Sequence, residues 1–127
     1  MDEYEFSLER DDDLYALYDQ LFSILGEKGI SRLDTTKVVT AASELARNII
    51  QYVGKGKIKI TIDENTVILT SEDNGKGIEH LDEILAGRYR SKHGLGKGLL
   101  AVKNLMDEMK IDTSPEGTKI RCVKYLG

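Results

Sequence analysis

The chain has 127 residues, of which 40% are hydrophobic and 31% charged, a balance typical of a globular domain and not of a disordered chain. Eighteen basic and 22 acidic residues leave a net charge of −4, which argues against broad nucleic-acid binding because that needs a concentrated positive surface. No apolar segment approaches the ~20 residues that span a bilayer, and the single Cys122 cannot form a disulfide within the chain. We expect one domain over residues 1–127, in the cytoplasm, with neither nucleic acid nor membrane as a partner.

The first half of the chain predicts a strand and two helices. Residues 4–9 alternate apolar and polar side chains, which indicates a strand with one buried face. Residues 11–29 have helical periodicity after an acidic start that suits a helix N-terminus. Its expected buried face comprises Leu14, Leu17, Tyr18, Leu21, Ile24 and Leu25. A second helix is predicted over 33–57, capped by Asp34 or Thr35. Its expected buried stripe comprises Val38, Ala42, Leu45, Ile49 and Val53.

The second half predicts two hairpins separated by a helix. Strands at 58–62 and 66–72 are joined by a turn, and a short apolar segment follows at 78–85. A third helix is predicted over 97–110, with an inward face of Leu99, Val102, Leu105, Met106 and Met109. A closing hairpin has Pro115 in its loop. Because the strands do not alternate one-to-one with helices, the pattern favours an α+β layer sandwich over a doubly wound parallel sheet.

Two polar side chains stand beside the buried stripe of the second helix. Glu44 and Asn48 are four residues apart and therefore share one helix face. Polar groups at the edge of a core are costly unless they have partners. They belong either to a solvent-facing polar line that includes Lys37 and Gln51, or to a functional site.

A second candidate follows the strand at 66–72. Asp73 precedes Asn-Gly, so it is either a turn residue that bonds its own backbone or an acceptor on a pocket floor. An acceptor there could bind an amino group, such as that of adenine. Gly75 and Gly77 would then allow the backbone to approach the base closely.

A third candidate is the glycine run ahead of the third helix. Gly94, Gly96 and Gly98 would expose backbone N–H groups at a helix start, which favours an anion such as phosphate. The run matches neither the P-loop nor the dinucleotide fingerprint, and alone it is weak evidence.

In chain order, these motifs resemble the GHKL superfamily of ATP-binding domains. The segments "SELARNIIQYVGKGKI", "EDNGKGI", "GLGKGLLAVKNLMDE" and "EGTKI" look most like the small serine/threonine switch kinases of the RsbT type, part of the anti-sigma-factor kinase branch. The resemblance runs from Asp34 to the end of the chain. It implies the Bergerat fold, a two-layer α/β sandwich with a mixed, mostly antiparallel sheet and helices on one face.

The resemblance also implies roles for individual residues. Asn48 would coordinate Mg²⁺ bridging the ATP phosphates, and Glu44 would be the general base or orienting carboxylate. Asp73 would bind the adenine amino group, supported by Thr118 from the neighbouring strand. The implied nucleotide-binding set is Asn48, Asp73, Gly75, Gly77, Ile78, Gly94, Leu95, Gly96, Lys97, Gly98, Leu99 and Thr118.

The segment between Gly77 and Gly94 would be the ATP lid. Its basic residues could meet the γ-phosphate or an acceptor protein, or form an ordinary solvated loop; they are Arg88, Arg90 and Lys92, with Lys97 just beyond. His93 is expected to be incidental, and Arg47 to point away from Glu44 and Asn48. Gln51 stands where many relatives carry a cation that touches phosphate, which puts the strength of phosphate engagement in doubt.

Two functions are compatible with the resemblance. One is a kinase that transfers the γ-phosphate of ATP to a Ser or Thr of a STAS-domain antagonist, with ATP and Mg²⁺ as cofactors. The other is a binding module that sequesters a sigma factor or activates a PPM-type phosphatase. A homodimer through the first helix and opening strand is a further option. An ATP-binding domain that has lost catalysis is a third interpretation, against which the presence of Glu44 speaks.

Overall fold

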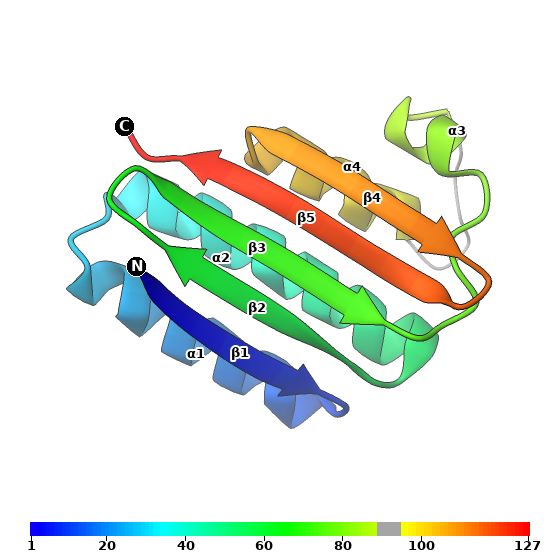
Figure 1. Cartoon of the computed structure of the whole chain (residues 1–127), viewed down its shortest axis with the longest axis horizontal. Coiled ribbons are helices and arrows are strands. Elements are labelled where there is room, and N and C mark those ends of the chain that lie inside the picture. The colour runs from blue at the N-terminus through cyan, green and yellow to red at the C-terminus, as the bar shows by residue number, and fades with distance from the viewer. Residues whose placement is uncertain (89–94) are drawn as a thin grey trace.

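Five strands of the protein form one sheet in a computed structural model that describes residues 1–88 and 95–127. The strands are β1 (Asp2–Leu8), β2 (Gly56–Ile62), β3 (Thr66–Asp73), β4 (Glu108–Ser114) and β5 (Gly117–Tyr125). The helices are α1 (Asp11–Glu27), α2 (Arg32–Asn48), α3 (Leu81–Leu85) and α4 (Leu95–Leu105), with the π-helix η1 (Ile49–Val53) continuing α2. The longer helices α1, α2 and α4 cover one face of the sheet (Figure 1). The predicted two-layer α/β sandwich is therefore confirmed.

The strand order of the sheet is β1-β2-β3-β5-β4, and every pairing of the described strands is antiparallel. The sheet that was expected to be mostly antiparallel thus has no parallel pair among those strands. The register places Asp73 at the end of β3 opposite Thr118 of β5, and Thr118 opposite Thr113 of β4. Asp73 therefore lies beside two threonines of a hairpin far from it in sequence, at one end of the sheet.

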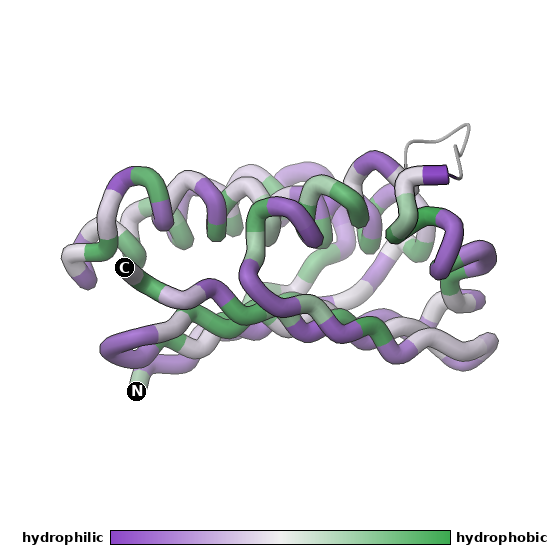
Figure 2. The backbone as a smooth tube through the Cα atoms, turned by 90° about the horizontal axis from the view of Figure 1, so that it is seen from above, coloured by the Kyte–Doolittle hydropathy of each residue, from purple (hydrophilic) through white to green (hydrophobic). Residues whose placement is uncertain are grey.

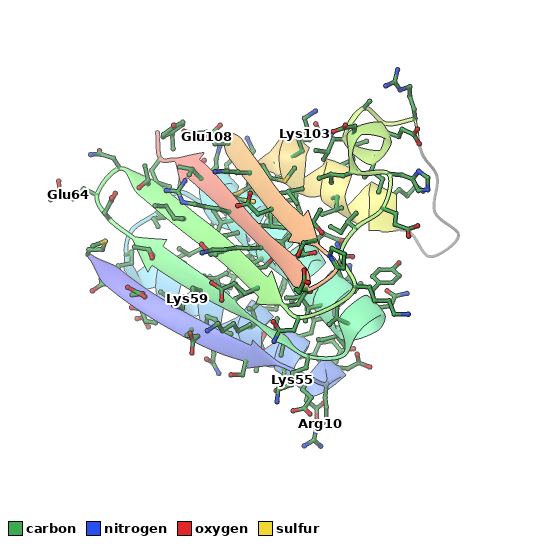
Figure 3. The ribbon with its side chains drawn as sticks, turned by 45° about the vertical axis from the view of Figure 1, so that its right-hand side comes forward. Arg10, Lys55, Lys59, Glu64, Lys103 and Glu108 are labelled. Atoms are coloured by element: carbon green, nitrogen blue, oxygen red, sulfur yellow. The ribbon has the colours of Figure 1, made fainter. Side chains whose placement is uncertain are left out.

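The core lies between the two layers, where the apolar positions of strands and helices meet (Figure 2). Alternate strand residues such as Ile58, Ile60 and Leu69 are fully buried, as expected for a sheet with one covered face. Leu17 and Leu21 fill the same layer from α1. Each such side chain stabilises the fold by about 1.5–3 kcal/mol relative to an exposed position. The open face of the sheet is polar. Lys59, labelled in Figure 3, lies on this face, and its Nζ is 4.0 Å from Glu5 Oε1.

The N-terminus of α2 differs from its prediction. Ser31 is the N-cap residue, and its Oγ accepts a hydrogen bond from the Asp34 N–H at 3.1 Å. The expected caps, Asp34 and Thr35, lie inside the first turn. A serine N-cap bonds the N–H three residues later, which fixes the helix start at Arg32. The helix therefore begins earlier than the apolar pattern indicated.

Three residues expected on buried helix faces lie elsewhere. Tyr18 of α1 is 47% exposed and Val53 of η1 is 38% exposed. Met109 belongs to β4, because α4 ends at Leu105 and the chain reverses there. The carboxylate of Asp107 fixes this reversal by accepting the Tyr125 N–H at 2.6 Å. None of the helices in the described ranges is long and apolar enough to cross a lipid bilayer.

Candidate functional site

A cleft of about 830 Å³ opens where β3 ends and β5 begins, beside α2, η1 and α3. Its volume is in the range of pockets that hold a nucleotide-sized ligand. Apolar side chains line much of the wall, namely Leu45, Ile49, Ile84, Leu99 and Ile120. The polar groups at one end are Ser71, Asp73 and Thr118, and Asn48 lies on the helix side. An apolar wall with a few fixed polar groups suits a flat heterocycle that carries a polar edge.

Glu44 and Asn48 of α2 face the start of α4. A Cβ built on Gly98 would lie 3.1 Å from Glu44 Oε2 and 3.4 Å from both amide atoms of Asn48. Because Gly98 has no side chain, its backbone on α4 can lie close to the Glu44 carboxylate and the Asn48 carboxamide on α2. The structure thus brings Gly98 of the glycine run into contact with the motif at 44–48.

Asn48 carries a polar atom that the fold leaves unpartnered. Its Nδ2 is buried and has no hydrogen-bond partner among the described residues. A buried amide group without a partner is costly, so such a group indicates a place for a ligand. The acceptor Oδ1 of the same carboxamide is an oxygen ligand of the kind that Mg²⁺ takes, although no group of three acidic or imidazole ligands exists within the described ranges. The residues present fit a metal shared with a bound phosphate, and not an all-protein metal cage.

Arg47 does not point away from Glu44, contrary to the prediction. Its Nη1 lies 2.6 Å from Glu44 Oε1 in an ion pair between residues three apart on the helix. The expectation was wrong because residues three apart are neighbours on a helix surface. One carboxylate oxygen of Glu44 is therefore held by Arg47, while the other lies against Gly98.

At the far end of the cleft, Asp73 makes the turn contact that was one of its two predicted alternatives. Its Oδ1 accepts the Gly75 N–H at 2.9 Å, which is a turn that an aspartate makes with its own backbone. Asp73 also lines the cleft. Gly75 packs closely there, since a Cβ on it would lie 2.8 Å from Val53 Cγ2.

Gly77 and Ile78 lie against the β4–β5 hairpin. Gly77 has φ +90, and a Cβ there would clash with the Ser114 carbonyl oxygen. The N–H of Ile78 donates to Thr113 Oγ1 at 2.8 Å, and this hydroxyl lies 2.8 Å from that of Thr118. Both Gly77 and Ile78 line the cleft. A glycine is required because an L-residue is strained at this φ.

The glycine run begins α4 instead of preceding it. Leu95 is the first residue of the helix, so Gly96, Lys97 and Gly98 form its first turn. Gly96, Gly98 and Leu99 are buried, whereas Lys97 is exposed. Gly94, Arg90, Lys92 and His93 lie outside the described residues. The described part of the run still offers a helix N-terminus beside Asn48, an arrangement that favours anions.

The segment expected to be the lid begins with the short helix α3, which packs on α4. Ile84 is 1% exposed and lines the cleft, and Lys103 Nζ donates to the Leu85 carbonyl at 3.1 Å. Lys103 is labelled in Figure 3. Arg88 is exposed and its N–H bonds the Glu83 carbonyl at 2.9 Å. Gln51 is exposed and is not among the residues that line the cleft.

Sequence reasoning missed several residues that line the cleft. Tyr52 and Val53 reach it because α2 continues as the π-helix η1, which is followed by Gly54 in a left-handed conformation. His80 and Pro115 also line it, and His80 has φ 58. The widened turn carried no sequence signal beyond Gly54, but π-turns occur frequently at functional sites.

The comparisons with known proteins agree with this geometry. The family model of the histidine kinase-like ATPase domain matches residues 8–124. The chain is 37% identical over 109 residues to the serine/threonine-protein kinase RsbT of Bacillus subtilis (strain 168), a match that covers 82% of both proteins. It is 35% identical over 103 residues to the anti-sigma F factor of the same bacterium, covering 73% of this chain and 70% of that protein.

Solved structures share the fold. The SiaB-SiaC complex of Pseudomonas aeruginosa matches with a TM-score of 0.77 at 15% identity, over 94% of this chain and 88% of that one. The RsbU and RsbW domains of Rv1364c from Mycobacterium tuberculosis match with a TM-score of 0.74 at 17% identity, over 99% of this chain but 32% of that one. The chain thus spans about a third of the latter protein. Fold, family model and sequence identity agree, and the chain belongs to the histidine kinase-like ATPase domain family, in the branch that includes serine/threonine switch kinases and anti-sigma factors.

Proposed function

We propose that the chain is a serine/threonine protein kinase that binds ATP in the cleft and transfers the γ-phosphate to a hydroxyl of a partner protein. The observation that carries this proposal is the position of Glu44 and Asn48 against Gly98 at the start of α4. A carboxylate, a carboxamide and a helix N-terminus meet where the phosphates of a nucleotide would end if its base lay beside Asp73.

The base end of the cleft supports adenine. Asp73 uses Oδ1 for the Gly75 N–H, and we assign its Oδ2 to the exocyclic amino group. Thr118, opposite Asp73 in the sheet, presents a hydroxyl to the same edge of the base. Ile49, Ile78 and Ile120 supply apolar surface for the ring faces.

The phosphate end supports a charged ligand with a divalent cation. Asn48 Oδ1 would hold Mg²⁺ together with phosphate oxygens and water, and the ion neutralises phosphate charge when bound. The N–H groups of Gly96, Lys97 and Gly98 lie in the first turn of α4 and would donate hydrogen bonds to the phosphate oxygens. The exposed Lys97 adds a positive charge on the same turn.

Glu44 is the group we assign to proton removal. Its Oε2 lies on the side of Gly98, and its Oε1 is paired with Arg47. In the transfer, the acceptor hydroxyl loses its proton to Glu44 as its oxygen bonds the γ-phosphorus, and ADP leaves with the bridging oxygen. Positioning and charge neutralisation supply most of the rate in such a reaction.

The acceptor we propose is a Ser or Thr of a STAS-domain antagonist in a bacterial partner-switching module, in the cytoplasm, where the buried thiol of Cys122 stays reduced. The similarity to RsbT supports a kinase, and the similarity to anti-sigma F factors supports a second role in sequestering a sigma factor. A PPM-type phosphatase is a third partner class. Exposed aromatic residues on α1 are available for protein contacts or a homodimer; they are Tyr15, Tyr18 and Phe22.

The first experiment measures ATP binding with Mg²⁺ by calorimetry for the wild type and for Asp73→Asn. Asparagine keeps the oxygen that bonds Gly75 but would turn an amino donor toward the adenine amino group. We expect binding at least about tenfold weaker in the variant, because the lost hydrogen bond involves a charged acceptor. A folded wild type that binds no ATP at millimolar concentration would overturn the proposal.

The second experiment follows label from γ-labelled ATP to a STAS-domain partner. Glu44→Ala should abolish the transfer and leave Mg-ATP binding largely intact, because Glu44 is not part of the base pocket. Full transfer by Glu44→Ala would contradict the assignment of the base. A wild type that binds ATP and captures its partner without labelling it would favour the sequestering role.

A further inference from the structure

A pair of hydrogen bonds connects the base end of the cleft to Thr113, a residue that does not line it. The Ile78 N–H donates to Thr113 Oγ1 at 2.8 Å, and Thr113 Oγ1 lies 2.8 Å from Thr118 Oγ1. In the sheet, Thr113 is opposite Thr118, and Thr118 is opposite Asp73. Thr118 lines the cleft and is 7% exposed. The Thr113 hydroxyl therefore lies behind the Thr118 hydroxyl as seen from the cleft.

The bond between the two threonines can run in either direction, and each direction leaves a different hydroxyl hydrogen without an acceptor. A hydroxyl has one hydrogen to donate and two lone pairs to accept with. The Ile78 N–H already uses one lone pair of Thr113. If Thr118 donated to Thr113 as well, Thr113 would accept twice and its own hydrogen would need another acceptor. If Thr113 donates to Thr118, the hydrogen left without an acceptor is that of Thr118, which lines the cleft and can be met there by a ligand.

From this geometry we propose that Thr113 is a positioning residue for nucleobase recognition, because it fixes the Thr118 hydroxyl as a hydrogen-bond donor toward the base. The proposal rests on the proposed function, since it places adenine beside Asp73. Thr113 itself does not touch the base. It acts through Thr118. Its hydrogen bond with the Ile78 N–H also connects this pair of threonines to the segment that follows Gly77.

The two groups that face the base are then complementary to adenine and mismatched to guanine. Adenine has an amino donor at C6 and an acceptor at N1. The Asp73 carboxylate can only accept, and a Thr118 hydroxyl held by Thr113 donates. Guanine reverses both positions, with a carbonyl at C6 and an N–H at N1. Discrimination of this kind is strong because a mismatched base leaves buried polar groups unpaired.

The experiment compares the dissociation constants of ATP and of 1-deaza-ATP, in which a C–H replaces the N1 acceptor. The wild type should bind 1-deaza-ATP about fivefold to tenfold more weakly, the ordinary worth of one neutral hydrogen bond. In Thr113→Val the Thr118 hydroxyl loses the donor that orients it. The ratio of the two constants should therefore fall toward one. The same variant should also bind GTP with a smaller disadvantage relative to ATP.

Thr113→Ser is the matched control, because it keeps the hydroxyl and should keep the wild-type ratio. Thermal melts of both variants establish that they fold. Equal weakening of ATP and 1-deaza-ATP by Thr113→Val, with the ratio unchanged, would show a purely structural role and overturn the inference. A wild type that binds ATP and 1-deaza-ATP equally would overturn it too, while the proposed function stands. A wild type that binds neither would overturn both.

Discussion

The carboxylate of Glu44 and the backbone of Gly98 lie against each other across the interface of α2 and α4. A Cβ on Gly98 would stand 3.1 Å from Glu44 Oε2, closer than such atoms ordinarily approach. Nothing about the backbone conformation of Gly98 requires glycine, since it lies in a helix without a positive φ. The small residue is explained by the space that Glu44 and Asn48 occupy, so the need for glycine here concerns the site and not the fold.

Gly98→Ala is therefore expected to separate activity from stability. The added methyl group should displace Glu44 and Asn48 and lower phosphoryl transfer at least about tenfold, since small misplacements of catalytic groups are costly. The melting temperature should stay the same or rise, because alanine favours a helix by up to about 1 kcal/mol over glycine. The control is Gly26→Ala in α1, where a Cβ would meet no atom within 4 Å. That variant should gain stability and keep full activity; similar losses of activity in both variants would contradict the explanation.

Removal of Arg47 is expected to impair the reaction through Glu44 alone. The Arg47–Glu44 pair is largely exposed on the Arg47 side, so its loss should change the free energy of unfolding by less than about 1 kcal/mol. Arg47→Ala should lower kcat while the dissociation constant of Mg-ATP stays near the wild-type value. Single-turnover transfer to the partner measures this.

A double-mutant cycle tests whether the two residues act as one unit. Measured on the slow residual transfer of Glu44→Gln, Arg47→Ala should cause little further loss, because the interaction that it removes is already gone. Additive losses in the double variant would indicate that Arg47 contacts ATP or the acceptor protein directly.

The sequence predicted the layers of the fold because the periodicity of apolar residues reflects burial directly. Leu17, Leu21 and Leu25 are buried where the pattern placed them. It could not predict the end of α4, since Met109 continues the helical spacing, whereas the contact of Asp107 with β5 at the chain reversal appears only in the folded structure. Tyr18 was misplaced for a related reason, because spacing alone does not tell which edge of an apolar stripe the neighbouring layer covers.

The candidate site was predictable as four segments but not as a network. Glu44, Asp73 and the glycines stood out by residue type and spacing. Thr113 did not, because a threonine in a strand is unremarkable until the register places it opposite Thr118. Tyr52 was equally hidden, since the π-helix that brings it to the cleft leaves no periodic pattern in the sequence.

Gly77→Ala is expected to disrupt both the fold around the cleft and nucleotide binding. Alanine at φ +90 is strained, by roughly 1–2 kcal/mol, and its Cβ would also clash with the Ser114 carbonyl oxygen. Gly29→Ala separates the two effects, because Gly29 has φ +76 and open space around it. Urea unfolding should show a larger loss of stability for Gly77→Ala than for Gly29→Ala, and only the former should weaken ATP binding. Equal losses of stability would mean that the hairpin moves to accommodate the methyl group.

Alkaline unfolding should report the burial of Cys122. Burial raises the pKa of its thiol from 9.0 to about 12, so between these values the unfolded chain loses a proton that the folded chain keeps. The stability that this group contributes is fully present below pH 9 and is lost as the pH rises toward 12. The free energy of unfolding should fall by up to about 1.4 kcal/mol per pH unit from this source.

Other groups titrate in the same range, so the measurement is the difference in pH dependence between the wild type and Cys122→Ala. The variant should be less stable at neutral pH, and the gap should narrow as the pH rises above 9. Parallel curves, or rapid reaction of the native thiol with a disulfide reagent, would show that Cys122 is accessible to water.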